Sequence, residues 1–360
     1  MVFHSIMSDA TFDKPQAGRL PRVLVSILNW NGTAKTLVCL TSLKAELAAA
    51  PAEITTLVID NGSRSDDVAA LAAGAAEHDV VLKCLPKNLG FTGGHNVAIE
   101  QAIRDGYDYI WLLNNDAKVV PGALRDLIVE LQTHPRCGVA SPVLRDIHDG
   151  HVGRCINGHD WQQRVSTKIL DIDEARRFQD EHPEAVWVDG TAVLFRVQAL
   201  KETGPLDDRL FAYYDDNDIG VRLANKGWFS RCVFSATVLH EDRNGLEQFP
   251  LYLSYLLKRN EMLFFHTHTP PAYRRMLWLK LVDRALYDAT RYREYGFRDH
   301  SDALLLGMLD FMRGRFGPPA HERKLPLLLN LVCTAAHRFY ALKNAKSRKA
   351  ARKASLAPAQ

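Results

Sequence analysis

Apolar residues in the front half of the chain gather in short, continuous runs that alternate with longer segments of helical composition. Five runs predict buried strands, because they are rich in bulky apolar residues and most end in polar, turn-forming sequence. The strands are predicted over residues 23–28, 54–60, 80–85, 109–116 and 138–144, and the helices over 33–49, 65–77, 96–104 and 121–133. Alternation at this spacing is typical of a mostly parallel sheet with right-handed crossovers. We therefore predict an α/β fold with a sheet flanked by helices.

The pattern changes twice further along the chain. Residues 145–185 are polar and weakly patterned, which predicts a variable excursion. Three later segments predict a strand entering a helix, a loop leading into a helix from about Asn217, and a last strand. They cover residues 187–200, 206–227 and 228–241. Beyond residue 251, long amphipathic helices with interleaved aromatic and basic residues are predicted, as over 252–265 and 273–295.

Charge divides the chain at the same place. Residues 251–360 contain 20 Lys and Arg against 8 Asp and Glu, a net charge of +12, which leaves −9 for residues 1–250. The net negative charge of residues 1–250 suits metal binding, and the net positive charge of residues 251–360 suits an anionic surface such as a membrane or nucleic acid. We expect four regions. They are a disordered lead-in (1–20), an α/β domain (21–250), an amphipathic basic helical region (251–345) and a disordered basic tail (346–360).

Segments that would direct the chain across a membrane are missing from the sequence. The N-terminus has no apolar stretch of the signal-peptide type, and no run approaches the roughly 18–20 apolar residues of a spanning helix. The six cysteines form no CxxC and no zinc-type spacing. We expect a cytoplasmic protein in a reducing compartment, with membrane contact only at the surface, peripherally at the inner face of the plasma membrane.

Polar, turn-rich sequence ends three of the predicted strands, at residues 29–32, 60–63 and 114–116. We expect these ends to share one edge of the sheet and, with the glycine-rich loop after the third strand, to form one pocket. Asn114, Asn115 and Asp116 end one strand, and their oxygens are ligands of the kind that Mg²⁺ or Mn²⁺ takes when it bridges a diphosphate. Asp60 ends another strand, where a carboxylate can accept hydrogen bonds from a nucleobase or a ribose. Both sets can equally be Asx turns that stop a strand.

A glycine-rich segment, Asn88–Asn96, follows the third strand and precedes a predicted helix. Backbone N–H groups there can bind phosphate. The segment has neither the GxGxxG spacing of dinucleotide-binding folds nor the ending of a P-loop.

Three carboxylates crowd into four positions at Asp215, Asp216 and Asp218. A helix N-terminus accounts for one or two of them, and crowding raises the pKa of one toward that of a useful general base. His240 ends the last predicted strand, where a ligand role competes with a purely structural one.

Taken in order, these pieces resemble glycosyltransferase family 2, in particular its rhamnosyltransferase-like branch. The matching segments are LNWNG (28–32), VIDNGS (58–63), NLGFTGGHN (88–96), LLNND (112–116), LDDRLFAYYDDNDIGVRLANKG (206–227), VLHE (238–241) and YLLKRNEMLFF (255–265), with a fainter echo at GMLDFMRGRFG (307–317). The resemblance covers about Val23 to Phe265. It implies a GT-A nucleotide-diphospho-sugar transferase fold with a C-terminal helical extension, a divalent metal (Mg²⁺ or Mn²⁺), and inversion at the anomeric carbon.

The resemblance also implies roles for individual residues. Asp216 matches the family's catalytic base and Asp215 the acid before it. Asp116 and Asn114 match the outer positions of a DxD-type metal motif, with His240 supporting the metal–diphosphate end. The donor-binding candidates are Asn29, Asn31, Asp60, Asn61, Asn88, Gly93, Gly94, Asn96 and Asn115.

Two departures from the family pattern change the expected chemistry. Asn114 replaces an aspartate, which removes one charge from the ligand set and predicts weak metal binding that depends on the donor diphosphate. Asp215 replaces a glutamate, which leaves open whether Asp215 or Asp216 is the base.

The branch favours dTDP-rhamnose as donor, with UDP-sugars next, and a glycan or lipid-linked acceptor in bacterial surface polysaccharide and cell wall assembly. The C-terminal helices, with Trp278, Tyr287 and Tyr292, suit a membrane interface, or they form an ordinary helical subdomain. Two alternatives stay open: a nucleotidyltransferase acting on sugar phosphates, and a catalytically impaired sugar-nucleotide-binding protein. An NAD-dependent dehydrogenase is disfavoured by the missing GxGxxG, and no recognised nucleic-acid-binding module is present.

Overall fold

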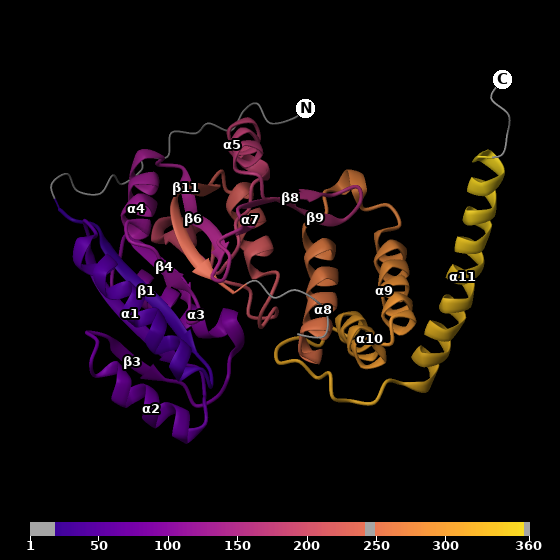
Figure 1. Cartoon of the computed structure of the whole chain (residues 1–360), viewed down its shortest axis with the longest axis horizontal. Helices are drawn as coiled ribbons and strands as arrows, with labels where there is room; N and C mark the ends of the chain where they lie inside the picture. Colours follow the sequence, from indigo (N-terminus) through magenta and orange to yellow (C-terminus); the bar gives the residue numbers. More distant parts are fainter. Residues whose placement is uncertain (1–18, 242–248, 356–360) are drawn as a thin grey trace.

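A computed structural model of the chain describes residues 19–241 and 249–355, with side chains described through Leu342 (Figure 1). Apart from residues 19 and 20, the lead-in predicted over 1–20 lies outside the described residues. The tail predicted over 346–360 is described only as backbone, and only to Ser355, where the last helix ends.

The described residues form a central sheet of nine strands in the order β3-β2-β1-β4-β10-β6-β11-β5, with β7 paired beside β6. The strands are β1 (Arg22–Asn29), β2 (Glu53–Asp60), β3 (Val81–Cys84), β4 (Tyr109–Asn114), β5 (Lys118–Val119), β6 (Cys137–Asp146), β7 (Val152–Arg154), β10 (Ala192–Arg196) and β11 (Phe229–His240). The first four strands pair in parallel, as do β6 and β11, whereas β10 runs antiparallel to β4 and β6. The predicted α/β fold is confirmed as a mixed, mostly parallel sheet.

Helices cover both faces of this sheet, and each face has its own hydrophobic core. Val23, Val25 and Ile27 point into one core and Leu24 into the other, which is why β1 is an unbroken apolar run. One face is covered by α1 (Thr33–Ala49), α2 (Ser65–Ala75) and α4 (Ala123–Thr133). The other is covered by α3 (Gly90–Arg104), α5 (Ile172–Glu181), α6 (Val197–Thr203) and α7 (Asp215–Asn225).

Three predicted boundaries were wrong. Helix α3 begins at Gly90, six residues before the predicted start, so most of the glycine-rich segment is helical. Helix α7 begins at Asp215 and strand β10 at Ala192. The excursion 145–185 holds β7, a hairpin of β8 (Ile156–Asp160) and β9 (Val165–Ile169), helix α5 and a short 3₁₀ turn, Pro183–Ala185.

Beyond the sheet, the chain forms four helices that pack around a separate apolar cluster (Figure 1). They are α8 (Leu251–His268), α9 (Leu277–Glu294), α10 (Arg298–Met312) and α11 (Leu327–Ser355), with a 3₁₀ turn at Pro271–Tyr273. The β8–β9 hairpin reaches toward these helices, and Trp161 at its tip contacts Phe264 and Phe265 of α8. None of the helices in the described part of the chain is both long and apolar enough to cross a membrane.

Candidate active site

The polar residues that end β1, β2 and β4 meet at one edge of the sheet, as the sequence predicts. Asn29 pairs in register with Asp60, and its neighbour Leu28 pairs with Asn114. Ligands bind beyond the carboxyl ends of the strands in sheets of this kind. The strand ends therefore supply one continuous polar wall.

Asn29 is the centre of a buried hydrogen-bond network in this wall. Its Nδ2 donates to Asp60 Oδ1 at 3.0 Å and to Asp67 Oδ2 at 2.9 Å. Its Oδ1 accepts from Thr36 Oγ1 at 2.8 Å, and Thr36 Oγ1 in turn accepts from Asn115 Nδ2 at 3.0 Å. The network ties the end of β2 to the loop after β4, so Asp60 and Asn115 are held in a fixed relation.

Asn31 lies two residues after Asn29 and borders the same polar wall. It has a left-handed backbone with φ of 49°, which asparagine tolerates better than most residues. Its Oδ1 accepts from the backbone N–H of Arg64 at 2.9 Å, and its own N–H donates to Ser63 Oγ at 2.8 Å.

The glycine-rich segment is held by two asparagine side chains. Asn61 is buried and donates to Asn88 Oδ1 at 3.1 Å and to the Gly90 carbonyl at 2.9 Å, while its Oδ1 accepts from the Leu89 N–H. Asn88 Oδ1 accepts from the Gly90 N–H at 2.7 Å. These contacts hold the loop between β3 and α3 and fix where α3 begins.

Packing explains why this segment is rich in glycine. Gly90 has φ of +78°, and a Cβ there would lie 2.2 Å from the Phe211 carbonyl oxygen. Gly94 is buried in α3, and a Cβ there would lie 2.5 Å from Leu28 Cδ1. Gly93 lies in the same helical turn, over Leu89. The side chain of Asn96 bonds the backbone of Leu206 in both directions at 2.9 Å.

The loop before α7 carries unusual backbone strain. Phe211, Tyr213 and Tyr214 all have positive φ, between 64° and 69°, although none is glycine. Such a conformation costs about 1–2 kcal/mol per residue and persists only where neighbouring structure enforces it. The loop leads directly into Asp215 and Asp216, so the strain sets where these carboxylates lie.

Arg259 and Asn260 of α8 supply the contacts that hold this loop. Both are fully buried. Asn260 Nδ2 donates to the carbonyls of Leu210, Ala212 and Tyr213 at 2.8–2.9 Å. Arg259 donates to the carbonyls of Leu210, Arg209 and Gly317. The segment YLLKRNEMLFF (255–265), which contains Arg259 and Asn260, therefore belongs to the site. It fixes the loop that leads into Asp215 and Asp216.

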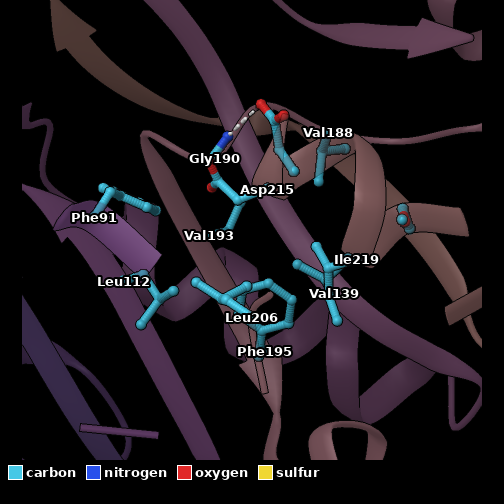
Figure 2. Close-up of a pocket in the computed structure, with 13 residues that line it drawn as sticks. Phe91, Leu112, Val139, Val188, Gly190, Val193, Phe195, Leu206, Asp215 and Ile219 are labelled. Atoms are coloured by element: carbon cyan, nitrogen blue, oxygen red, sulfur yellow. Dashed lines mark hydrogen bonds between the residues drawn. The ribbon is translucent and has the colours of Figure 1, made fainter. Parts of the chain in front are cut away.

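Asp215 and Asp216 begin α7 above an apolar pocket (Figure 2). The pocket is lined by Phe91, Leu112, Val139, Val188, Val193, Phe195, Leu206 and Ile219, among others. Burial, and then the neighbouring charge of Asp216, raise the pKa of Asp215 well above its ordinary value. Burial, and then the charge of Asp189, raise the pKa of Asp216 to about 6. Asp215 is buried, whereas Asp216 keeps partial access to solvent.

Asp216 is also oriented by hydrogen bonds. Its Oδ1 accepts from both the backbone N–H and the side-chain Nδ2 of Asn217 at 2.8 Å, and its Oδ2 accepts from the Gly190 N–H at 3.4 Å, drawn in Figure 2. Asn217 is positioned in turn by Ser166 of the β8–β9 hairpin, whose hydroxyl donates to Asn217 Oδ1 at 3.0 Å. The hairpin is thus linked to the acidic pair through one residue.

Asp189 is a site residue that the sequence analysis missed. It precedes β10, accepts from Thr191 Oγ1 at 2.6 Å, and pairs with Arg154 at 3.3 Å. The Thr191 carbonyl accepts from the Asn114 N–H at 2.8 Å. Asp189 therefore joins the acidic pair to the end of β4. The only local sign of it was an Asp-Gly pair breaking an apolar segment.

Two of the residues predicted to hold a metal, Asp116 and His240, come together near the ends of β4 and β11. His240 Nε2 lies 3.2 Å from Asp116 Oδ1, and Lys35 Nζ lies 3.6 Å from Asp116 Oδ2. A carboxylate oxygen and an imidazole nitrogen at this separation fit adjacent positions around a divalent ion. Asn114 ends β4 two residues before Asp116, with its backbone N–H and carbonyl in protein hydrogen bonds. The donor set therefore fits a metal but carries one carboxylate.

A second group of ligand-type side chains lies at the β6–β7 turn. Asp146, Asp149 and His151 have ligand atoms within 4.8 Å of one another. Asp146 Oδ1 accepts from the backbone N–H groups of His148 and Asp149. These bonds are those of a turn.

Comparisons with known proteins agree with this geometry. Residues 21–260 match the family model described as "Glycosyltransferase like family 2". The chain is 28% identical to an N-acetylglucosaminyl-diphospho-decaprenol L-rhamnosyltransferase of Mycobacterium tuberculosis over 219 residues, which is 55% of this chain and 69% of the relative.

Two solved structures share the fold. The mannosyltransferase PcManGT from Pyrobaculum calidifontis, in complex with GDP-Man and Mn²⁺, aligns with a TM-score of 0.53 at 15% identity, over 84% of this chain and 91% of its own. TarS 1–349 of S. aureus, in complex with UDP-GlcNAc, aligns with a TM-score of 0.54 at 12% identity, over 88% of each chain.

The family model covers two thirds of the chain and includes every residue of the site described above. The predicted GT-A fold and glycosyltransferase activity are confirmed. The chain belongs to glycosyltransferase family 2 and is a nucleotide-sugar-dependent glycosyltransferase.

Proposed function

We propose that this glycosyltransferase inverts the anomeric centre of its donor, with Asp216 as the general base. The observation that carries this proposal is the pairing of two carboxylates in different states. Asp216 has a pKa of about 6 and partial access to solvent, so it is ionised at neutral pH. Asp215 is buried, and its burial and the charge of Asp216 raise its pKa well above the ordinary value, which favours its protonated form over that of Asp216. The choice between the two carboxylates falls on Asp216.

The proton transfer follows from this state. An acceptor hydroxyl is a poor nucleophile until a base takes its proton, and an ionised carboxylate within hydrogen-bond distance does so as the new bond forms. The Asn217 hydrogen bonds fix Asp216 Oδ1 and leave Oδ2, with its longer Gly190 contact, to face the hydroxyl. Oδ2 accepts the proton, the acceptor oxygen attacks the anomeric carbon, and the bond to the nucleoside diphosphate breaks on the opposite face.

Asp116 and His240, with Asn114, are the residues that would hold Mg²⁺ or Mn²⁺ at the leaving-group end. When bound, a divalent ion supplies positive charge that stabilises the departing diphosphate. The Lys35 ammonium already lies beside Asp116, so it offsets part of the negative charge there and faces the same diphosphate. Mn²⁺ in the PcManGT complex supports this assignment.

The nucleoside end of the donor falls to the wall formed by β1 and β2. We propose that Asp60 and Asn31 contact the base and ribose there, Asp60 through the oxygen lone pairs that its bonds from Asn29 and the Ser63 N–H leave over, and Asn31 through its side-chain N–H groups. The side chains of Asn29, Asn61 and Asn88 hydrogen-bond to protein groups. We assign them to the structure of the wall and not to contact with the donor. Gly94 and Asn96 similarly set how α3 packs, and Gly93 and Asn115 complete the diphosphate side.

We propose dTDP-rhamnose as the donor and a glycan or lipid-linked hydroxyl as the acceptor, in bacterial surface polysaccharide assembly. Support comes from the rhamnosyltransferase of Mycobacterium tuberculosis that the chain resembles. UDP-GlcNAc and GDP-Man in the two structural neighbours make UDP- and GDP-sugars the comparison donors.

A thermal-shift screen with Mn²⁺ tests the donor, because a ligand that binds only the folded state raises Tm, and at equal concentration the ligand with the lower Kd raises it more. The largest shift is expected for dTDP-rhamnose, with weaker shifts for UDP- and GDP-sugars. A larger shift with another sugar nucleotide would replace rhamnose. In His240→Ala the Mn²⁺-dependent part of the shift should disappear, whereas His78→Ala, in the partly exposed turn between α2 and β3, should keep it.

A further inference from the structure

Over Leu327–Leu342, where its side chains are described, helix α11 packs on the rest of the protein with one face. Cys333 and Tyr340 are buried, and the Tyr340 hydroxyl donates to Asp283 Oδ1 of α9 at 2.6 Å. The Tyr287 ring of α9 meets Tyr340 edge to face. Figure 1 shows α11 at the end of the molecule opposite the first strands of the sheet, with α9 as its neighbour.

The other face of α11 is apolar and exposed. Its side chains are Leu327, Leu328, Leu331, Val332, Phe339 and Leu342, which are 74, 74, 57, 41, 60 and 66% exposed. At 3.6 residues per turn these positions fall within an arc of about 140°, so they form one apolar strip, in which Arg338 is the single basic residue. Scattered apolar residues on a surface need no explanation, but a strip along four turns of one helix does.

The charge of this segment is uniformly positive. Residues 325–360 contain seven Lys and Arg and not one Asp or Glu. Six of the seven follow the apolar strip, between Lys343 and Lys353. An apolar strip followed by basic residues complements a lipid bilayer, whose acyl region is apolar and whose headgroups can be anionic.

We propose that the strip Leu327–Leu342 of α11 docks the enzyme on an anionic lipid bilayer, with the helix lying in the plane of the membrane. A second copy of the chain fits less well, because two such segments would bring only positive charges together. A spanning arrangement is disfavoured, because no described helix has enough apolar length. The proposal stands independently of the donor and of the catalytic base.

Two aromatic residues expected at the membrane have other roles. Tyr292 packs against the apolar cluster of the C-terminal helices, and Tyr287 packs on Tyr340. The aromatic side chain that the strip itself presents is Phe339. The proposed strip therefore lies on α11, while Trp278 and Tyr287 of α9 also remain partly exposed, at 44 and 39%.

Vesicle co-sedimentation of the full-length protein tests the proposal. The wild type should bind vesicles containing phosphatidylglycerol at low salt, bind neutral phosphatidylcholine vesicles at least ~10-fold more weakly, and lose most of its binding at high salt. The variant Leu328→Gln/Leu331→Gln/Phe339→Gln should bind anionic vesicles at least ~10-fold more weakly. Its folding is expected to be unchanged, because the three side chains are exposed.

A matched control carries Val38→Gln and Val129→Gln, which replace exposed apolar residues on α1 and α4. This control should bind vesicles like the wild type, and its Tm and circular dichroism should match those of the triple variant. Absence of binding to anionic vesicles at low salt would overturn the proposal, as would wild-type binding by the triple variant. A dimer in sedimentation velocity that the triple variant abolishes, without any vesicle binding, would assign the strip to a second copy instead.

Discussion

Substitution of Asn217 by alanine gives a sharp prediction about the catalytic base. Asn217 Nδ2 donates to Asp216 Oδ1 at 2.8 Å, and this bond favours the ionised carboxylate. Alanine removes the side-chain donor and keeps the backbone N–H bond. A hydrogen bond to a charged group contributes about 1.5–3 kcal/mol, which corresponds to about 1–2 pKa units. The pKa of Asp216 should therefore rise from about 6 to between about 7.1 and 8.2.

The consequence for the reaction depends on pH. With a pKa of about 6, roughly 90% of Asp216 is ionised at pH 7; after the substitution the fraction falls to between about 6 and 45%. Turnover at pH 7 should fall about 2- to 15-fold, and at pH 9 it should return to within about 1.3-fold of the wild type. The assay is release of nucleoside diphosphate at saturating donor and acceptor, followed from pH 5 to pH 9.

Ser166→Ala is the matched control for this experiment. Ser166 reaches Asp216 only through Asn217 and leaves both Asn217 donors in place. The acidic limb of the pH–rate profile of Ser166→Ala should move to higher pH, but by less than that of Asn217→Ala. A loss of activity in Asn217→Ala that is equal at every pH would refute the reasoning, since it would mean that the hydrogen bond does not set the ionisation of the base.

Three further predictions follow from the same contacts. Asp189→Asn removes the charge that helps to raise the pKa of Asp216, so the acidic limb of the pH–rate profile should move to lower pH. Asp216→Asn should stabilise the fold: the folded pKa of about 6 exceeds the unfolded value of 3.8, so the wild type loses up to about 3 kcal/mol as pH rises from 4 to 6. Its Tm should exceed that of the wild type at pH 7.5 and equal it at pH 4. Asn260→Ala should lower the free energy of unfolding by about 3 kcal/mol in urea, because the carbonyls of Ala212 and Tyr213 in a strained loop lose their side-chain donor, whereas the Leu210 carbonyl keeps Arg259.

Much of the sheet could be predicted because its strands are buried on both faces. Val23, Val25 and Ile27 contact one core and Leu24 the other, which produces the unbroken apolar run that the sequence displays. The polar residues that end these strands share one edge because parallel pairing places Asn29 beside Asp60. The position of these strand-end residues therefore follows from the sheet topology alone.

The start of α3 could not be predicted, because glycine and asparagine disfavour helix locally. Tertiary contacts outweigh that preference: Gly90 meets the Phe211 carbonyl, and Gly94 meets Leu28. Asp189 was missed for a related reason. It reaches Asp216 only through the antiparallel pairing of β10 with β4 and the packing of α7, and a single carboxylate leaves no repeating pattern in the sequence.

The donor-side asparagines illustrate another limit of sequence reasoning. Asn29, Asn61 and Asn96 stand in family motifs, yet their amides hydrogen-bond to protein groups. An asparagine that builds a binding wall and one that contacts the ligand look the same in a sequence. The distinction needs the partner atoms, which come from segments far apart in the chain.

The central claim is that Asp216 acts in chemistry and not in donor binding. It is tested most directly by single-turnover kinetics of Asp216→Asn with donor bound at saturation, alongside Asp79→Asn as an exposed carboxylate control. The variant should bind donor with an unchanged Kd and transfer sugar at least ~10²-fold more slowly at every pH, whereas the control should match the wild type. Transfer by Asp216→Asn at a near-normal rate would contradict the account.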